Sequence, residues 1–110
     1  MADFIHRHST HIRTPEGAEY RAVIWADRQR DGTWAGWIEF MPVGGGPVLR
    51  TERETTQPSR RALDYWASGI EPVYLWGAFE RAQVATVNKG RRRSVRKQQP
   101  RSSFNPIFTR

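Results

Sequence analysis

The chain has 110 residues, and its 18 Lys and Arg against 11 Asp and Glu give a formal net charge of +7. This length suits one domain with a modest core and excludes multidomain enzymes and the (α/β)₈ barrel, which needs about 250 residues. The absence of cysteine excludes disulfides, thiolate zinc sites and iron–sulfur clusters. No apolar run approaches the roughly 18 residues of a membrane span, and the first residues lack a signal-peptide layout, so we expect a cytoplasmic protein.

The positive charge is concentrated at the C-terminal end. Residues 89–110 hold eight of the 18 Lys and Arg and no acid, whereas residues 1–88 hold ten basic and 11 acidic residues, a net of −1. The segment is poor in apolar residues, so we expect residues 89–110 to be a disordered basic tail. It could be a solubilising tail without a specific partner, or an arm that contacts the phosphates of DNA or RNA. The candidate nucleic-acid-binding residues are Lys89, Arg91, Arg92, Arg93, Arg96, Lys97 and Arg101.

Residues 1–17 form a second segment that we expect to be flexible. They contain His6, His8 and His11, and three imidazoles at this spacing could bind a divalent metal. No carboxylate or thiol motif completes a metal site, so the favoured interpretation is a polar leader without a metal or other cofactor.

The first regular elements are two runs rich in β-branched and aromatic residues, 20–27 and 33–41. The Asp31-Gly32 pair between them is a strong turn signal, because glycine accepts positive φ at little cost. The pattern therefore predicts an antiparallel hairpin. A glycine-rich connection at 42–47 then leads to a predicted third strand at 48–55.

Two helices are predicted after the strands. Ser59 and Gly69 are typical of the start and the end of a helix over about 59–68. The spacing of apolar residues favours a second helix over 72–86, with a short fourth strand at 72–76 as the alternative. The predicted fold is α+β: a three-stranded, possibly four-stranded, antiparallel sheet with one or two helices on one face. This domain would span residues 18–88, between flexible N- and C-terminal tails.

Both faces of the predicted sheet are apolar, although an antiparallel sheet with one solvated face normally has one polar face. One or two helices cover only one face, and an uncovered apolar face marks an interface. We therefore expect a homodimer or a partner protein across the second face, unless the second helix or the tails cover it. The candidate interface residues are Val23, Trp25, Ala35 and Trp37.

Two other functions are open at this stage. Tryptophans on a sheet can stack unpaired bases, so Trp25 and Trp37 could serve a single-stranded RNA-binding protein. Glu52 and Glu54 lie two residues apart at a strand-to-helix junction, where a carboxylate pair could do acid–base work. Interleaved charges of this kind are more often a solvated edge, so we expect no enzyme and no catalytic residues.

The hairpin and the residues after it suggest a family. A strand leads through Asp31-Gly32 into a second strand that ends near Pro42, and a third strand and a threonine precede a helix between Thr51 and Trp66. Over about residues 20–66 this order resembles HicB-type antitoxins. The resemblance implies a partly RNase-H-like α+β fold without catalysis, dimerisation, and binding of a small RNA-cleaving toxin. The sequence as a whole predicts an antitoxin-like, non-catalytic binding module that joins a partner through its sheet and nucleic acid through its tail.

Overall fold

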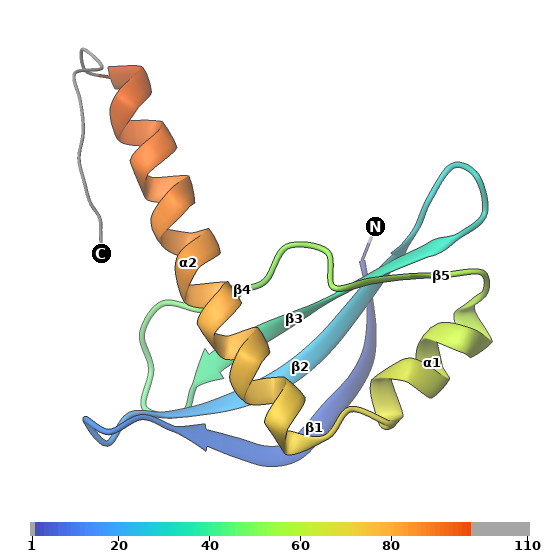
Figure 1. Ribbon diagram of the computed structural model, residues 1–110, viewed down its shortest axis with the longest axis horizontal. Coiled ribbons are helices and arrows are strands. Elements are labelled where there is room, and N and C mark those ends of the chain that lie inside the picture. The colour runs from blue at the N-terminus through green and yellow to red at the C-terminus, as the bar shows by residue number, and fades with distance from the viewer. Residues whose placement is uncertain (1, 98–110) are drawn as a thin grey trace.

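The computed structural model describes residues 2–97, with side chains through Val87, and its fold is α+β, as predicted (Figure 1). Its elements in chain order are β1 (Asp3–Arg13), β2 (Glu19–Arg28), β3 (Trp34–Pro42), β4 (Leu49–Arg50), β5 (Thr55–Gln57), α1 (Arg60–Ser68) and α2 (Pro72–Lys97). The strands form one antiparallel sheet in which β2 lies between β1 and β3, and both β4 and β5 pair with β3.

The predicted hairpin is confirmed as β2 and β3. Gly32 has a φ of 90°, and the Asp31 carboxylate accepts hydrogen bonds from the Thr33 amide at 3.0 Å and its hydroxyl at 2.7 Å. These bonds close the turn, and they hold the pKa of Asp31 below its usual value. The turn sets a register in which Trp25 lies opposite Trp37.

The predicted flexible leader is wrong, because residues 3–13 form the long edge strand β1. Its inward residue Ile12 is fully buried, and Ile5 packs against the core. A turn stabilised by a hydrogen bond from the Gly17 amide to the Thr14 carbonyl joins β1 to β2. The register of β1 shifts between Phe4 and His6 and again before His11. Such bulges interrupt the alternation of inward and outward residues, so the sequence lacks the usual strand pattern.

The predicted third strand is interrupted and yields only the short strands β4 and β5. At the break the Thr51 side chain turns inward and is 2% exposed. Its hydroxyl accepts a hydrogen bond from the Ile38 amide at 3.0 Å, while the Thr51 amide donates to the Ile38 carbonyl at 2.9 Å. The residues between Thr51 and β5 therefore leave the regular ladder, and Glu54 resumes contact with β3 by donating its amide to the Gly36 carbonyl.

Both predicted helices are present, but the second ends later than the predicted residue 86. Ser59 caps α1 by accepting a hydrogen bond from the Ala62 amide, and Gly69 follows its last turn. Helix α2 begins at Pro72, so the alternative strand at 72–76 is wrong. It continues through Lys97, so residues 89–97 are helical rather than part of a disordered tail. A helix already anchored by packing adds further turns without a new nucleation step. Residues 98–110, including Arg101, lie outside the described residues.

The core lies between one face of the sheet and the two helices. In Figure 1 helix α2 crosses the sheet, and α1 lies at its side near β5. Strand residues 22, 24, 38 and 40 are fully buried there against Leu75, Ala78, Phe79 and Ala82 of α2 and Ala67 of α1. The ring of Phe79 contacts both Phe40 and Tyr20, with centroids 5.3 and 4.9 Å apart. Among the described residues, neither helix offers a stretch long and apolar enough to cross a membrane.

Candidate interaction face

No helix within residues 2–97 covers the second face of the sheet, and we call this face the open face. Residues that pair directly across antiparallel strands project to the same side. By this register the open face comprises Phe4, Arg7 and His11 of β1, Arg21, Val23, Trp25 and Asp27 of β2, Ala35, Trp37, Glu39 and Met41 of β3, Arg50 of β4 and Thr56 of β5. The four predicted interface residues, Val23, Trp25, Ala35 and Trp37, are therefore brought together on one face, as the alternation indicated.

An aromatic row crosses the middle of the open face. Phe4 lies opposite Trp25, and Trp25 lies opposite Trp37, so three adjacent strands each contribute one ring. The rings of Phe4 and Trp25 meet edge to face at 6.0 Å. Phe4 is 51% exposed. The sequence alone gives no signal for Phe4, because this residue lies in the segment that is predicted to be a flexible leader.

The accessible apolar surface differs from the predicted set. Val23 and Ala35 are only 5% and 6% exposed, so the larger neighbouring side chains already cover them. The exposed apolar groups near the row are Phe4, Met41 and Val43. With Arg7, Arg21 and Pro42 they line a groove of about 410 Å³ over Val23 and Trp25. A partner would meet this groove first.

Charged side chains of both signs surround the aromatic row. The Arg50 guanidinium lies 4.4 Å from the centre of the Trp37 ring, a cation–π contact. Arg7 lies in the same cross-strand row as Val23 and Glu39, and Arg21 lies opposite Met41. The open face thus combines aromatic rings, methionine and arginine, the residue types enriched in protein interfaces.

Two hydrogen-bond donors of the open face are unused. The indole N–H groups of Trp25 and Trp37 are buried and have no acceptor among the described residues. A buried donor without an acceptor costs about 1–3 kcal/mol. Packing and the cation–π contact therefore hold these rings, and pairing either donor requires a movement of the face.

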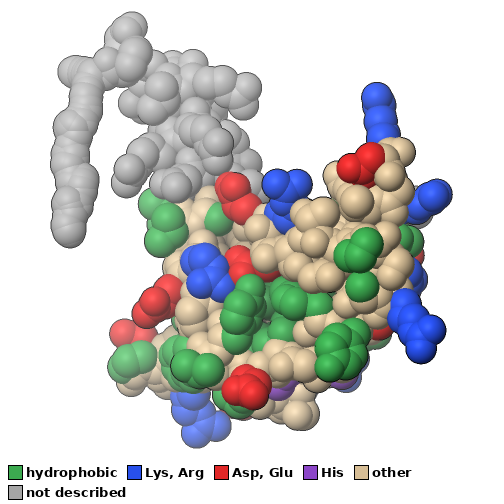
Figure 2. All heavy atoms as spheres, turned by 45° about the vertical axis from the view of Figure 1, so that its right-hand side comes forward, with side chains coloured by type: hydrophobic (Ala, Val, Ile, Leu, Met, Phe, Trp, Pro, Cys, Tyr) green, Lys and Arg blue, Asp and Glu red, His purple; other side chains and the backbone are tan. Residues whose placement is uncertain are grey.

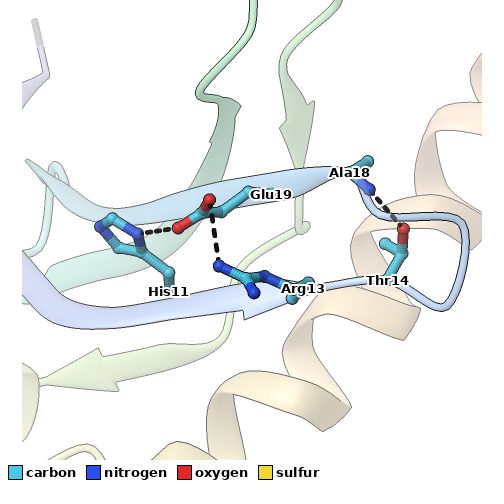
Figure 3. A network of polar contacts seen from close by, with 5 residues as sticks. All are labelled: His11, Arg13, Thr14, Ala18 and Glu19. Carbon is cyan, nitrogen blue, oxygen red and sulfur yellow. Dashed lines mark hydrogen bonds and ion pairs between the residues drawn. The ribbon is translucent and has the colours of Figure 1, made fainter.

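The three histidines do not converge on one point. The His8 ring accepts from the Thr10 amide and donates from Nε2 to the Ile70 carbonyl at 2.7 Å, which ties β1 to the α1–α2 connection. His11 instead donates from Nδ1 to Glu19, which Arg13 also contacts at 3.5 Å (Figure 3). The hydrogen bond from His11 is the main cause that holds the pKa of Glu19 below its usual value. Among the described residues, no group of His, Asp and Glu has the arrangement of a metal site.

The Glu52–Glu54 pair, the candidate for acid–base chemistry, lies in the connection between β4 and β5 rather than on one strand. The Glu54 carboxylate is 7% exposed and accepts hydrogen bonds from the Tyr74 hydroxyl at 2.6 Å and from Arg81 at 2.7 and 2.9 Å. Burial raises the pKa of Glu54, but these hydrogen bonds and the charge of Arg81 outweigh burial, so the pKa lies below its usual value. Burial and the same carboxylate raise the pKa of Tyr74 to about 12. Glu54 therefore anchors α2 as an ionised carboxylate.

Exposed apolar groups also occur on the helical side of the molecule. Figure 2 shows hydrophobic side chains gathered on one side, with acidic and basic side chains around them. On the helices Tyr65, Val73 and Trp76 are 84%, 76% and 43% exposed. These residues supply a comparison surface against which the open face can be tested.

In the comparisons with known proteins, no family model, no curated protein and no solved structure matches the chain. The resemblance to HicB-type antitoxins therefore stays a prediction from the hairpin residues.

Proposed function

We propose that this protein is a non-catalytic binding module that pairs with a second copy of itself through the open face. The observation that carries this proposal is the aromatic row of Phe4, Trp25 and Trp37, which lies on three adjacent strands and is covered by neither helix of the described chain. Protein interfaces have an apolar, aromatic centre and a charged rim, and this face has both.

A second copy is favoured over an unrelated partner by the charges around the row. Arg7, Arg21 and Arg50 share the face with Glu39, while Glu19 lies at its edge. A twofold axis places each patch against its own copy, so a surface with both signs can be self-complementary. Residues 1–88 have a net charge of only −1, so the domains do not repel each other strongly.

The experiment is a measurement of molar mass by light scattering at micromolar concentration, on wild type and two variants. Met41→Asp places a charge in the groove of the open face, whereas Val73→Asp places the same charge on the helical side, at a more exposed position. We expect a dimer for wild type and Val73→Asp and a monomer for Met41→Asp, with unchanged circular dichroism. A monomeric wild type, or a Met41→Asp variant that still dimerises, would overturn the proposal.

The proposed role in the cell is regulatory and antitoxin-like, with nucleic acid contacted through the basic C-terminal residues. Residues 89–110 carry eight positive charges and no acid, which supports contact with phosphates. Toxin binding rests only on the resemblance of the hairpin to HicB-type antitoxins. Glu54 is buried in an ion pair with Arg81, and this arrangement gives no support to an acid–base site at Glu52 and Glu54.

Single-stranded RNA binding is a second candidate, favoured by the arginines beside the aromatic row. Arg50 already lies against Trp37, so the exposed ring of Phe4 is the first surface available to an unpaired base. If RNA binds here, a uridine oligonucleotide should quench tryptophan fluorescence at low salt, and Phe4→Ala should weaken this quenching while Val73→Ala does not. Equal quenching in both variants would show that RNA does not bind at the exposed ring of Phe4.

A further inference from the structure

Helix α2 has two parts with different surroundings. Its first part packs on the sheet through Leu75, Ala78, Ala82 and Ala85, which are 0–7% exposed. Val87 is already 56% exposed. Beyond it the helix runs on to Lys97 and projects past the sheet in Figure 1. The last turns of α2 are therefore held in place by a helix whose base is anchored in the core.

The spacing of residues continues unchanged through this transition. The buried positions 75, 78, 82 and 85 recur in alternating steps of three and four, the repeat that keeps residues on one side of an α-helix. The same steps lead to positions 89, 92 and 96, which are Lys, Arg and Arg. Positions 93 and 97 beside them are also basic, and no acidic residue follows Glu80. One helical register thus changes from apolar to basic where the helix leaves the sheet.

We infer that residues 89–97, the basic arm, bind duplex DNA as a helix lying in the major groove. This inference rests on the nucleic-acid contact proposed above and specifies its form. An α-helix with side chains is about 10–12 Å wide, and the major groove of B-DNA is about 12 Å wide. The major groove of an RNA duplex is too narrow and deep for side chains to read. DNA is therefore the duplex that fits.

The length and composition of the basic arm agree with this form of binding. Nine residues at 1.5 Å each span about 13 Å, the length of about four base pairs. The arm contains Arg91, Arg92, Arg93 and Arg96 together with two lysines. Arginine presents a planar set of donors that binds phosphate oxygens or a guanine edge in bidentate fashion, which suits both walls and the floor of the groove.

Gly90 allows the helical state to be tested without changing any charge, because it lies inside the basic arm and has no side chain. Gly90→Pro removes an amide donor and clashes with the carbonyl of Thr86, so it breaks the helix where the arm begins. Gly90→Ala is the matched control, since alanine favours the helix. The core should be unaffected in both variants, which unchanged urea unfolding would verify.

The measurement is fluorescence anisotropy with a labelled 16-base-pair DNA duplex and an RNA duplex of the same sequence, at one fixed salt concentration. We expect wild type to prefer DNA, Gly90→Ala to bind DNA at least as tightly, and Gly90→Pro to lose about tenfold or more in affinity for DNA. Equal DNA binding by Gly90→Pro and wild type would overturn the helical arm.

A further variant, Arg92→Glu with Arg93→Glu, separates the two proposals. If charge reversal weakens binding and Gly90→Pro does not, the nucleic-acid contact stands and the helical arm fails. If the wild type binds neither duplex at low salt, the nucleic-acid contact and the helical arm fail together.

Discussion

The two faces of the sheet come from alternate residues of the same strands, yet they have different surroundings. On the covered face Ile24, Ile38 and Phe40 are fully buried by residues of α1 and α2. On the open face Val23 and Ala35 are nearly as buried, although they are not part of the core cluster that the described helices cover. Apolar content alone does not distinguish the faces.

The faces differ in how their apolar side chains are covered. On the covered face the helices of the same chain, which follow the strands in sequence, bury these side chains. The open face keeps exposed apolar groups at Phe4 and Met41, and its two indole donors find no acceptor in the described part of the chain. We therefore propose that the open face contributes less to the stability of the folded chain than to binding, since exposed apolar faces often mark interaction sites.

The largest expected effect is the loss of stability when a residue of the covered face is truncated. Phe40 and Met41 are neighbours in β3 that face opposite sides of the sheet, so truncating each in turn compares the two faces. Phe40 is fully buried against Phe79, so Phe40→Ala should lower the free energy of unfolding by about 3–5 kcal/mol. Met41 is 43% exposed, so Met41→Ala should cost less than about 1 kcal/mol in the monomer. Urea unfolding at submicromolar concentration, where dimerisation contributes little, measures both values. Similar losses for the two variants would mean that the open face is part of the core.

The attachment of α2 to the covered face should depend on Glu54. Glu54→Gln removes the ionised acceptor of Arg81, and a hydrogen bond to a charged group contributes about 1.5–3 kcal/mol. We expect a loss toward the lower end of that range, because the Arg81 side chain is 51% exposed. Urea unfolding at pH 7 measures the loss.

The pH dependence of the same variant tests the charge itself. The pKa of Glu54 is lowered in the folded protein, so its contribution to stability is present above the usual glutamate pKa and disappears as the pH falls through the lowered value. Wild type should therefore lose more stability than Glu54→Gln between about pH 5 and pH 3. Other carboxylates, such as Glu19 and Asp31, add the same pH dependence to the free energy of unfolding in both proteins. Parallel pH profiles would contradict the role given to Glu54.

Local chemistry allowed much of this fold to be predicted from the sequence. The Asp31-Gly32 turn, the Ser59 cap and Gly69 each act over a few residues, so the hairpin and α1 could be recognised directly. The alternation along β2 and β3 also separated the two faces correctly. These signals need no knowledge of distant residues.

The features that cannot be predicted from the sequence depend on contacts between distant segments. The bulges of β1 remove its alternating pattern, so the strand and the contribution of Phe4 to the open face were not recognised. Thr51 turns inward because Ile38, 13 residues away, supplies its hydrogen bonds. Arg81 and Glu54 are 27 residues apart, and only the packing of α2 brings them together. The length of α2 was underestimated because its apolar spacing ends where the basic arm begins.

The smallest expected effect concerns the arginine that covers part of the open face. Arg50→Gln removes the cation–π contact with Trp37, which contributes about 0.5–1 kcal/mol at an exposed site. Arg53→Gln is the control, since it makes the same change of charge in the nearby β4–β5 connection. Urea unfolding should show a larger loss for Arg50→Gln, and tryptophan emission should change in that variant alone, because Trp37 becomes more accessible to water. Equal losses with unchanged emission would show that Arg50 contributes only its charge, and that packing among Phe4, Trp25 and Trp37 holds the aromatic row without it.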